Sequence, residues 1–488
     1  MKRTLAFSAP ALSALVLLAG CTVGPDYKRP PAPVPAAYKE TGWKTAEPQE
    51  AISRGPWWSI YDDPVLDGLE RQIDISNQNL KAAEAAYVQA RAVVAEGVSG
   101  YFPTLSVTGS GTRSGHGGPS SVSFGGGSVS NSAVDLTADA SWSVDLWGRI
   151  RRTVESDVAN AQATAADLAN ARLSAQAQVA TLYFELRATD EEVRLLDASV
   201  TAFTQSLQIT RNQYAAGVAA QADVVNAETQ VEQTRSQAIA VGVQRAQFEH
   251  AIATLIGKPA SDFALATAPI TSSVPVAPPG VPSTLLERRP DVAAAERIMA
   301  SANAQIGIAI AAYYPDLTLT GSYGFSSTGL AKLLRASNSL WSAGGSLAET
   351  VFDAGLRGAQ VAAAKATYNG DVANYRQTVL TAFQQVEDEL AALGILARQA
   401  EVQANTVRLA REAERLTLNQ YEGGTVPYTS VLTAQTTRLN NEVTANTILQ
   451  ERLLASVSLI EALGGGWSAS DLPSAEQVKA DPPAETTR

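Results

Sequence analysis

The sequence predicts a mainly α-helical protein with a smaller β part, built from two tandem repeats that each contain a β-hairpin followed by a long α-helical hairpin. Three observations predict this fold class. Motifs recur at equal spacings in the two halves of the 488-residue chain, apolar and polar residues alternate before each helical stretch, and the helical stretches are long, rich in Ala and free of Pro. Because of the duplication, the length does not indicate about three ordinary domains.

The duplication is visible in aromatic and glycine motifs. Tyr101-Phe102-Pro103 in the first half recurs as Tyr313-Tyr314-Pro315 in the second. Three further positions have the same spacing in both halves, 66 residues and then 43 residues: Gly148, Tyr214 and Gly257 in one half, and Gly355, Tyr421 and Gly464 in the other. We therefore assign repeat 1 to residues 61–270 and repeat 2 to residues 271–467.

The first twenty residues have the pattern of a secretory signal peptide. Lys2 and Arg3 precede an apolar stretch, 5–18, that is shorter than the roughly 20 residues a membrane-spanning helix needs. The stretch ends in Leu18-Ala19-Gly20-Cys21, which is similar to a bacterial lipobox. We expect removal of residues 1–20 and a covalent lipid, diacylglycerol with an N-acyl chain, on Cys21. The alternative is an ordinary signal peptide with an incidental Cys21.

The residues after Cys21 predict a tether. Thr22, rather than Asp, follows Cys21, and this resembles the outer-membrane sorting pattern of lipoproteins. Six prolines between Pro25 and Pro48 remove backbone donors and fix φ. Residues 21–60 are therefore expected to be an extended, lipidated tether.

Two stretches predict β-hairpins, at about 103–147 and about 315–352. Apolar and polar residues alternate from Val134 to Leu146, so this strand has one apolar and one polar face. Such strands, with aromatic residues near their ends, are typical of a transmembrane β-barrel; a soluble sandwich is the alternative. Four strands cannot close a barrel, and open edges in lipid leave backbone groups unpaired. Two copies would give about eight strands and a filled barrel, whereas three give about twelve and a lumen, so we expect a homotrimer in outer-membrane lipid.

Long helices are predicted at about 149–213 and 218–256 in repeat 1, and at about 356–420 and 426–463 in repeat 2. A helix of 66 residues extends about 99 Å, and small apolar residues around much of its surface favour a tube of neighbouring helices. Shorter helical patterns, 64–97 and 285–312, precede the strands. Gly148 and Gly355 are expected to permit sharp strand-to-helix bends. The Pro-containing tail, 468–488, is predicted to be disordered.

Composition excludes several classes of function. The net charge is −11, and no Lys/Arg cluster interleaved with aromatics is present, so nucleic acid is not an expected partner. A single Cys and two His leave no cysteine-cluster metal site and little for zinc or triad chemistry. No nucleotide-binding, hydrolase or metalloprotease motif occurs. We expect no enzyme activity, no metal and no cofactor other than the covalent lipid.

Three motifs carry a resemblance to a known family: Cys21-Thr22-Val23-Gly24-Pro25-Asp26-Tyr27, Arg288-Arg289-Pro290-Asp291-Val292 and Phe352-Asp353-Ala354-Gly355. With the duplication, the chain resembles the outer-membrane factors of tripartite efflux systems, the TolC-like proteins, in the lipoprotein branch that works with resistance-nodulation-division pumps. The resemblance runs from the lipobox to about Gly466. It implies a trimer with a twelve-stranded barrel and a twelve-helix periplasmic tunnel, whose tip meets an adaptor protein and an inner-membrane pump.

The resemblance places the periplasmic aperture and adaptor contact at the helix turns around Gly217 and Gly424. Asp223 and Glu228 follow the first turn. Thr429, Thr433 and Thr436 follow the second on one helical face, so three copies would project rings into the lumen. Some relatives have an acidic and a basic residue at the positions of Thr433 and Thr436, which puts an ion-pair latch there in doubt. The alternative is that these are solvated turn residues.

The function implied by the resemblance is a passive exit duct for drugs or other small molecules. A duct for protein or peptide secretion by an ATP-driven exporter is an alternative on the same fold. A non-conducting periplasmic scaffold lipoprotein is a third hypothesis, but it leaves the amphipathic strands unexplained.

Overall fold

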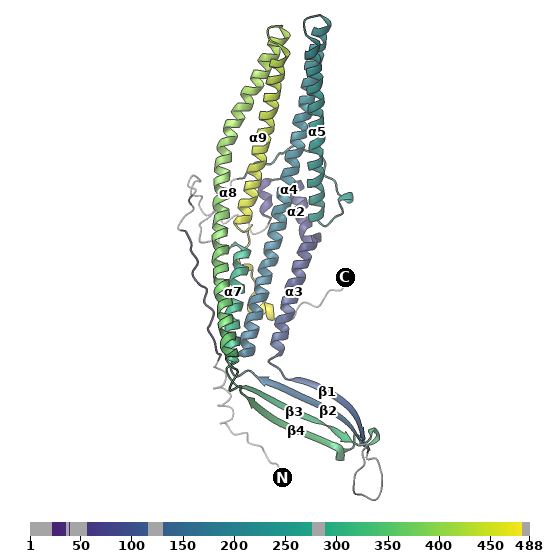
Figure 1. Ribbon diagram of the computed structural model, residues 1–488, viewed down its shortest axis with the longest axis vertical. Helices are drawn as coiled ribbons and strands as arrows, with labels where there is room; N and C mark the ends of the chain where they lie inside the picture. Colours follow the sequence, from purple (N-terminus) through teal and green to yellow (C-terminus); the bar gives the residue numbers. More distant parts are fainter. Residues whose placement is uncertain (1–21, 36–38, 40–55, 116–129, 276–287, 481–488) are drawn as a thin grey trace.

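The computed structural model describes residues 22–35, 39, 56–115, 130–275 and 288–480. The molecule is elongated, with a four-stranded sheet at one end and the turns of two helical hairpins at the other (Figure 1). No helix in these ranges is both long and apolar enough to cross a membrane.

Two long helical hairpins form the body. In repeat 1, α4 (Arg149–Ala215) pairs with α5 (Gln221–Leu255), and in repeat 2, α8 (Leu356–Glu422) pairs with α9 (Tyr428–Ala462). The corresponding helices have equal lengths, 67 and 35 residues, in both repeats. The observed ends lie within three residues of the predicted ones. The hairpins pack together through α4 and α9, which leaves α5 and α8 on the outer flanks.

Two shorter helices continue the columns of α5 and α9 toward the sheet. They are α3 (Gln78–Ser99), which lies below α5, and α7 (Pro290–Ala311), which lies below α9; both pack against α4 (Figure 1). The prediction of a single helix over residues 64–97 is wrong. The chain forms α2 (Pro64–Ser76) and then α3, because the Asn77 side chain caps α3 by accepting from Leu80 N at 2.9 Å.

At the joint between each pair of stacked helices, the ends touch. Gly257, at φ 68°, follows α5, and a Cβ on it would lie 2.1 Å from the carbonyl oxygen of Ser76. Gly464, at φ 92°, follows α9, and a Cβ there would lie 1.9 Å from the carbonyl oxygen of Arg288. Side chains bridge both joints: Asn77 Nδ2 donates to Leu255 O at 2.7 Å, and Arg289 Nη1 donates to Ala462 O at 2.9 Å. Only glycine fits both the left-handed backbone and the close approach.

The sheet joins the two repeats edge to edge. Its strands are antiparallel in the order β1 (Thr104–Gly115), β2 (Ser130–Val144), β3 (Asp316–Ser327) and β4 (Ser339–Ala348). The register aligns apolar rows, such as Val107, Ala138, Tyr323 and Trp341, and polar rows, such as Ser106, Asp139, Ser322 and Ser342. The sheet therefore has the apolar and polar faces that the alternation predicts.

Each strand-to-helix bend turns at a glycine beside an aspartate. Gly148 and Gly355 adopt left-handed conformations, with φ 80° and 90°. Asp145 accepts hydrogen bonds from Ile150 N and Arg151 N at the start of α4. Asp353 accepts from Arg357 N at the start of α8. Both bends thus combine a backbone only glycine favours with an acceptor at a helix N-terminus.

The C-terminal tail is not disordered throughout, which corrects that expectation for residues 468–480. A short helix, α10 (Ala475–Lys479), packs on α3 and α4. Its Val478 is buried in an apolar cluster with Val94 on α3 and Val154 on α4, and this contact holds the short helix on the body. Residues 481–488 lie outside the described part of the chain.

The predicted tether is also more than a spacer. Residues 22–35 contain no helix or strand, as expected, but they lie against the body. Residues 57–61 form a 3-10 turn whose Trp57, Trp58 and Tyr61 are buried in the central core. Cys21 and the signal peptide lie outside the described residues.

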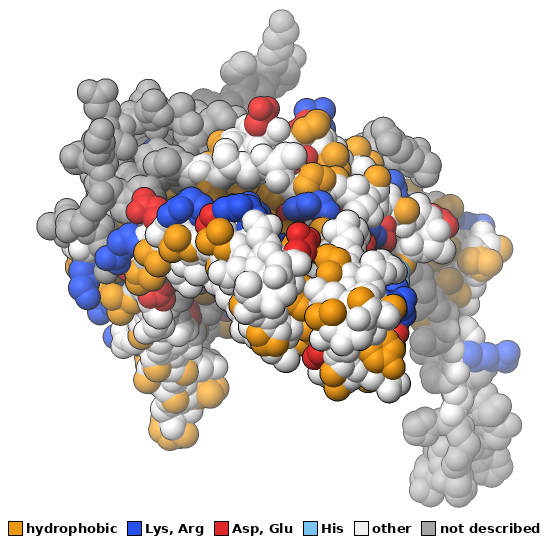
Figure 2. Space-filling view, turned by 90° about the horizontal axis from the view of Figure 1, so that it is seen from above, with side chains coloured by type: hydrophobic (Ala, Val, Ile, Leu, Met, Phe, Trp, Pro, Cys, Tyr) orange, Lys and Arg blue, Asp and Glu red, His pale blue; other side chains and the backbone are white. Residues whose placement is uncertain are grey.

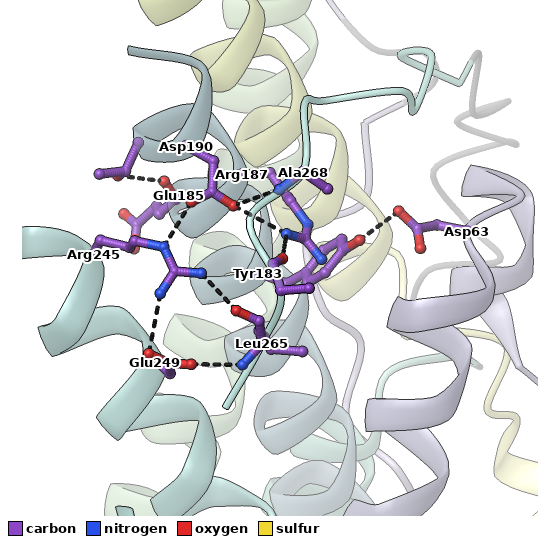
Figure 3. A network of polar contacts seen from close by, with 11 residues as sticks. Asp63, Tyr183, Glu185, Arg187, Asp190, Arg245, Glu249, Leu265 and Ala268 are labelled. Atoms are coloured by element: carbon purple, nitrogen blue, oxygen red, sulfur yellow. Dashed lines mark hydrogen bonds and ion pairs between the residues drawn. The ribbon is translucent and has the colours of Figure 1, made fainter. Parts of the chain in front are cut away.

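A buried polar network ties the segment between the repeats to hairpin 1 (Figure 3). The Asp190 carboxylate on α4 is 0% exposed and accepts from Arg187 Nη1 at 3.0 Å, Arg245 Nε at 2.7 Å and the backbone N of Ala268 at 3.1 Å. Arg245 also donates to Leu265 O at 2.6 Å and pairs with Glu249. The two arginines neutralise Asp190, and the linker backbone satisfies the remaining hydrogen bonds.

We expect Asp190→Ala to destabilise the protein by about 3 kcal/mol, because it leaves the buried Arg187 and the partly buried Arg245 without their shared carboxylate. Urea unfolding followed by tryptophan fluorescence measures this. Asp197→Ala is the matched control, because Asp197 is exposed on the same helix. Equal unfolding of the two variants would contradict the assigned role of the network.

Candidate functional site

The candidate site is the pair of hairpin turns at the end of the molecule farthest from the sheet. In the first turn, Gly217 has φ 75° and Val218 N donates to Gln213 O at 2.9 Å. In the second, Gly424 has φ 70° and Thr425 N donates to Gln420 O at 3.0 Å. Both are the helix-terminating turn that glycine closes in the left-handed conformation. The two repeats therefore present the same backbone at the tip.

The side chains at the two turns differ. Tyr421 and Tyr428 flank the second turn, with ring centroids 5.9 Å apart, and both are buried. The Tyr421 hydroxyl lies 2.9 Å from Thr210 Oγ1 on α4, and Gln213 Nε2 donates to Tyr421 O at 3.3 Å. Tyr214, the repeat equivalent of Tyr421, is 47% exposed, whereas Tyr421 is 3% exposed. The second turn is thus latched onto the first hairpin through tyrosine.

Asp223 lies where the two hairpins meet. Its Oδ2 accepts from Ala220 N at 3.3 Å, which caps the start of α5. Burial raises the pKa of Tyr428 to about 12, and the charges of Tyr421 and Asp223 add to that effect. The Tyr428 hydroxyl has no hydrogen-bond partner among the described residues. Within this part of the chain, the Tyr428 hydroxyl is therefore buried without a partner and near the Asp223 carboxylate, so a small movement of the turn can change its hydrogen bonding.

Glu228 does not reach the second hairpin. Its Oε1 pairs with Arg211 Nη2 at 2.7 Å across hairpin 1, and both side chains are about half exposed. This ion pair holds α4 to α5 near the turn and contributes little to stability.

Some of the threonines near the start of α9 line a groove of about 470 Å³ between α8 and α9. Thr429 and Thr433 lie in its wall together with Thr437, and Thr433 Oγ1 donates to Thr429 O at 2.8 Å. Thr436 is half-buried and is not part of this wall. The structure therefore brings together two of the three predicted threonines.

A largely buried ion cluster on the sheet side of the second turn was not predicted. Arg438 on α9 contacts both Glu414 on α8 and Glu442 on α9, and its Nη2 donates to Ser199 Oγ on α4 at 3.3 Å. Arg411 Nε adds a contact to Glu442 at 2.7 Å. In hairpin 1, the equivalents of Glu414 and Arg438 are Leu207 and Val231. Comparing the repeats position by position would have found this replacement of an apolar layer by charge.

Charged side chains elsewhere are mixed. Seen from above, a band of Lys and Arg with adjacent Asp and Glu crosses the molecule (Figure 2). Ion pairs three residues apart on one helix, such as Arg194 with Glu191 and Arg415 with Glu412, also place opposite charges side by side. Such pairs solvate the helix surfaces and do not form a patch of one sign.

Comparison with known proteins decides the family. A model described as "Outer membrane efflux protein" matches residues 69–258 and 281–465, one segment in each repeat. The chain belongs to this family. Outer membrane protein OprJ of Pseudomonas aeruginosa is 30% identical over 472 residues, which cover 95% of this chain and 96% of the relative. The solvent efflux pump outer membrane protein SrpC of Pseudomonas putida is 29% identical over 468 residues, covering 95% and 99%.

A solved structure supports the same assignment. The outer-membrane channel OprN superposes with a TM-score of 0.82 at 30% identity, covering 92% of this chain and 100% of that one. The resemblance inferred from the sequence is thereby confirmed at the level of the family and of the TolC-like fold. The protein is an outer-membrane component of an efflux system, and the hairpin turns are the end of the molecule opposite its β-sheet.

We expect Tyr421→Ala to loosen the tip, because it removes a buried ring and the contact with Thr210, at a local cost of about 3 kcal/mol. Hydrogen exchange should become faster in the turn after Tyr421, and the conductance of the reconstituted channel should rise. Tyr214→Ala removes the exposed repeat equivalent and should change neither quantity. Matching effects of the two substitutions would contradict the tyrosine latch.

Proposed function

We propose that the chain is a passive exit duct that conducts small molecules from an inner-membrane pump and a periplasmic adaptor to the outside. The main observation behind this proposal is that the sheet and the row of long helices are both open at their two edges. The edge strands β1 and β4 each have one neighbouring strand, and the helices α5 and α8 lie on the outer flanks. Copies of the same chain can cover these flanks and enclose a lumen. No chemical step and no cofactor is needed for conduction.

The uncovered flank of α8 carries a row of apolar residues at the spacing typical of a helix–helix interface. Ile395, Val402, Leu409 and Leu416 follow one another at seven-residue spacing, and all are exposed. Val402 is 69% exposed, whereas its repeat equivalent on α4, Leu195, is 7% exposed in the core that includes Leu439 of α9. In the same way, Ile239 on α5 is exposed while its equivalent on α9, Asn446, is buried. The contact of α4 with α9 is therefore a template for a contact between α8 of one copy and α5 of the next.

The number of copies follows from the sheet. Two copies give about eight strands, whose barrel is filled by side chains, while three give about twelve and an open lumen. The polar face of the sheet, with Asp135, Asp139 and rows of Ser and Thr, would then line the water-filled side. We take a homotrimer as the assembly.

A lipid on Cys21 fits this arrangement. Thr22, the next residue, lies against Gly148, so a Cβ on Gly148 would be 2.7 Å from Thr22 Cγ2. One residue spans at most about 3.6 Å, so the lipid would attach at the level of the strand-to-helix bends. Acyl chains at that level would enter the periplasmic leaflet beside the barrel. This supports the proposal that the lipid anchors the duct.

We expect Val402→Glu to weaken the trimer, because it places a charge in the apolar seam between α8 and the neighbouring α5. Light scattering of the detergent-purified protein over a dilution series should show that the variant dissociates at a protein concentration at least tenfold higher than the wild type does. Ala404→Glu adds the same charge at an exposed position on another face of α8 and is the matched control. A wild-type monomer, or equal dissociation of both variants, would contradict this seam.

The duct itself is tested by crosslinking in cells, with a photoreactive residue at Val218 or Thr425 beside the two turn glycines. We expect capture of a periplasmic adaptor, and deletion of the gene should raise the cellular accumulation of pump substrates until the wild-type gene is restored. A photoreactive residue at exposed Lys365, near the sheet end of α8, should not capture the adaptor. Capture of an ATP-driven exporter would move the function to secretion, and absence of any inner-membrane partner would overturn the duct.

A further inference from the structure

Residues 22–31, here called the clasp segment, cross from one repeat to the other below the helix joints. The segment starts at the bend before α4, passes between α4 and α7, and continues beside α8 (Figure 1). Its first backbone contact is Val23 N donating to Trp147 O at 3.1 Å. A contiguous piece of chain thus touches three helices that belong to both repeats.

The fit at the centre of the segment leaves no room for a side chain. Gly24 has φ 94°, and a Cβ on it would lie 2.5 Å from the Cα of Gly307 on α7. A Cβ on Gly307 would in turn lie 2.9 Å from Cγ of Arg152 on α4. The backbone of Gly24 therefore packs on the backbone of Gly307, which in turn packs on the aliphatic part of the Arg152 side chain. This packing depends on glycine at both positions.

Arg152 makes more hydrogen bonds to the clasp segment than any other residue that the structure describes. Its side chain is 4% exposed, and its guanidinium donates to Val23 O at 3.2 Å, Gly24 O at 3.3 Å and Asp26 Oδ1 at 2.9 Å. The remaining partner is Glu155, one turn along α4. Without the clasp segment, the guanidinium would lose three of these four acceptors in a groove shaped around them.

The other side of the groove holds the segment with repeat 2. Asn303 Nδ2 on α7 donates to Pro25 O at 2.9 Å, and the Tyr27 hydroxyl donates to Glu296 on α7. Farther along, Arg29 Nε donates to the Tyr375 hydroxyl on α8 at 3.0 Å. Residues 23–25 are held through their backbone carbonyls, and residues 26, 27 and 29 through their side chains. The contacts therefore depend on both the extended backbone and the sequence of the segment.

The arginine that holds the clasp segment is not repeated at the equivalent position of α8. The residue equivalent to Arg152 in α8 is Ala359, which has no hydrogen-bonding side chain. Within the part of the chain that the structure describes, this arginine site therefore occurs once, where repeat 1 meets α7 of repeat 2. We propose that the clasp segment acts as an internal ligand of this groove and holds α7 against α4, so that it fastens the two repeats together below the joints.

The test is limited proteolysis and thermal unfolding of the purified full-length protein with two variants. Gly24→Ala adds a Cβ that collides with Gly307, and Arg152→Lys keeps the charge but cannot bind three acceptors as a planar fork. Both should release the segment, so that trypsin cleaves after Lys28 at least tenfold faster than in the wild type. Each should also unfold about 2–4 °C lower.

Matched controls carry the same substitutions elsewhere. Gly68→Ala adds a Cβ in open space on α2, and Arg149→Lys changes an exposed arginine three residues before Arg152. Both should remain as resistant as the wild type, and neither should unfold at a lower temperature, because Ala favours the helix over Gly at position 68. Faster cleavage without a lower unfolding midpoint would show that the segment docks without fastening the helices. A lower midpoint without faster cleavage, or no effect on either, would show that these contacts do not hold it; each of these results overturns the proposal.

Discussion

The unpaired edges of β1 and β4 are the constraint on which the rest of the architecture depends. Each edge presents backbone N–H and C=O groups, and hydrocarbon offers no partner for them. The helices repeat the same situation, because α5 and α8 are the outer members of the row of long helices, as β1 and β4 are of the sheet. One rotation that brings β4 to a neighbouring β1 therefore also brings α8 to a neighbouring α5. In the proposed homotrimer, the sheet and the helices would therefore be completed by one and the same rotation.

Duplication gave two similar backbones, but the buried charges that hold the chain together are not duplicated. Asp190 and Arg187 fasten the segment between the repeats, and their equivalents in α8 are Ala397 and Gly394. Arg152 grips the N-terminal segment, and its equivalent is Ala359. The α4 helix of repeat 1 therefore binds two non-helical segments, the one between the repeats and the N-terminal one. The helices α8 and α9 of repeat 2 instead carry an ion cluster around Arg438. The hairpins share a shape and differ in what restrains them.

The sequence was informative wherever a structure depends on spacing. Recurrent glycines located the long helices within three residues, and strand alternation located both faces of the sheet. It was uninformative about which polar residues are buried, because helices that pack on two sides lose a clear apolar stripe. Glu70 is an example: it is fully buried, and burial raises its pKa to about 9, so it is protonated at neutral pH. The break at Asn77, the docked segments at both ends and the tyrosine latch depend on contacts between residues far apart in the chain, which spacing does not encode.

The helix joints at Gly257 and Gly464 also bear on how such a tube can change in size. At each joint the stacked helices touch without forming one continuous helix, while α4 and α8 run past it unbroken. Whole turns could be inserted in α4 and α5, and equally in α8 and α9, above the joint without shifting α3, α7 or the sheet. Reach across the periplasm and fit to the membrane are therefore separable dimensions, and evolution can alter one without remodelling the other.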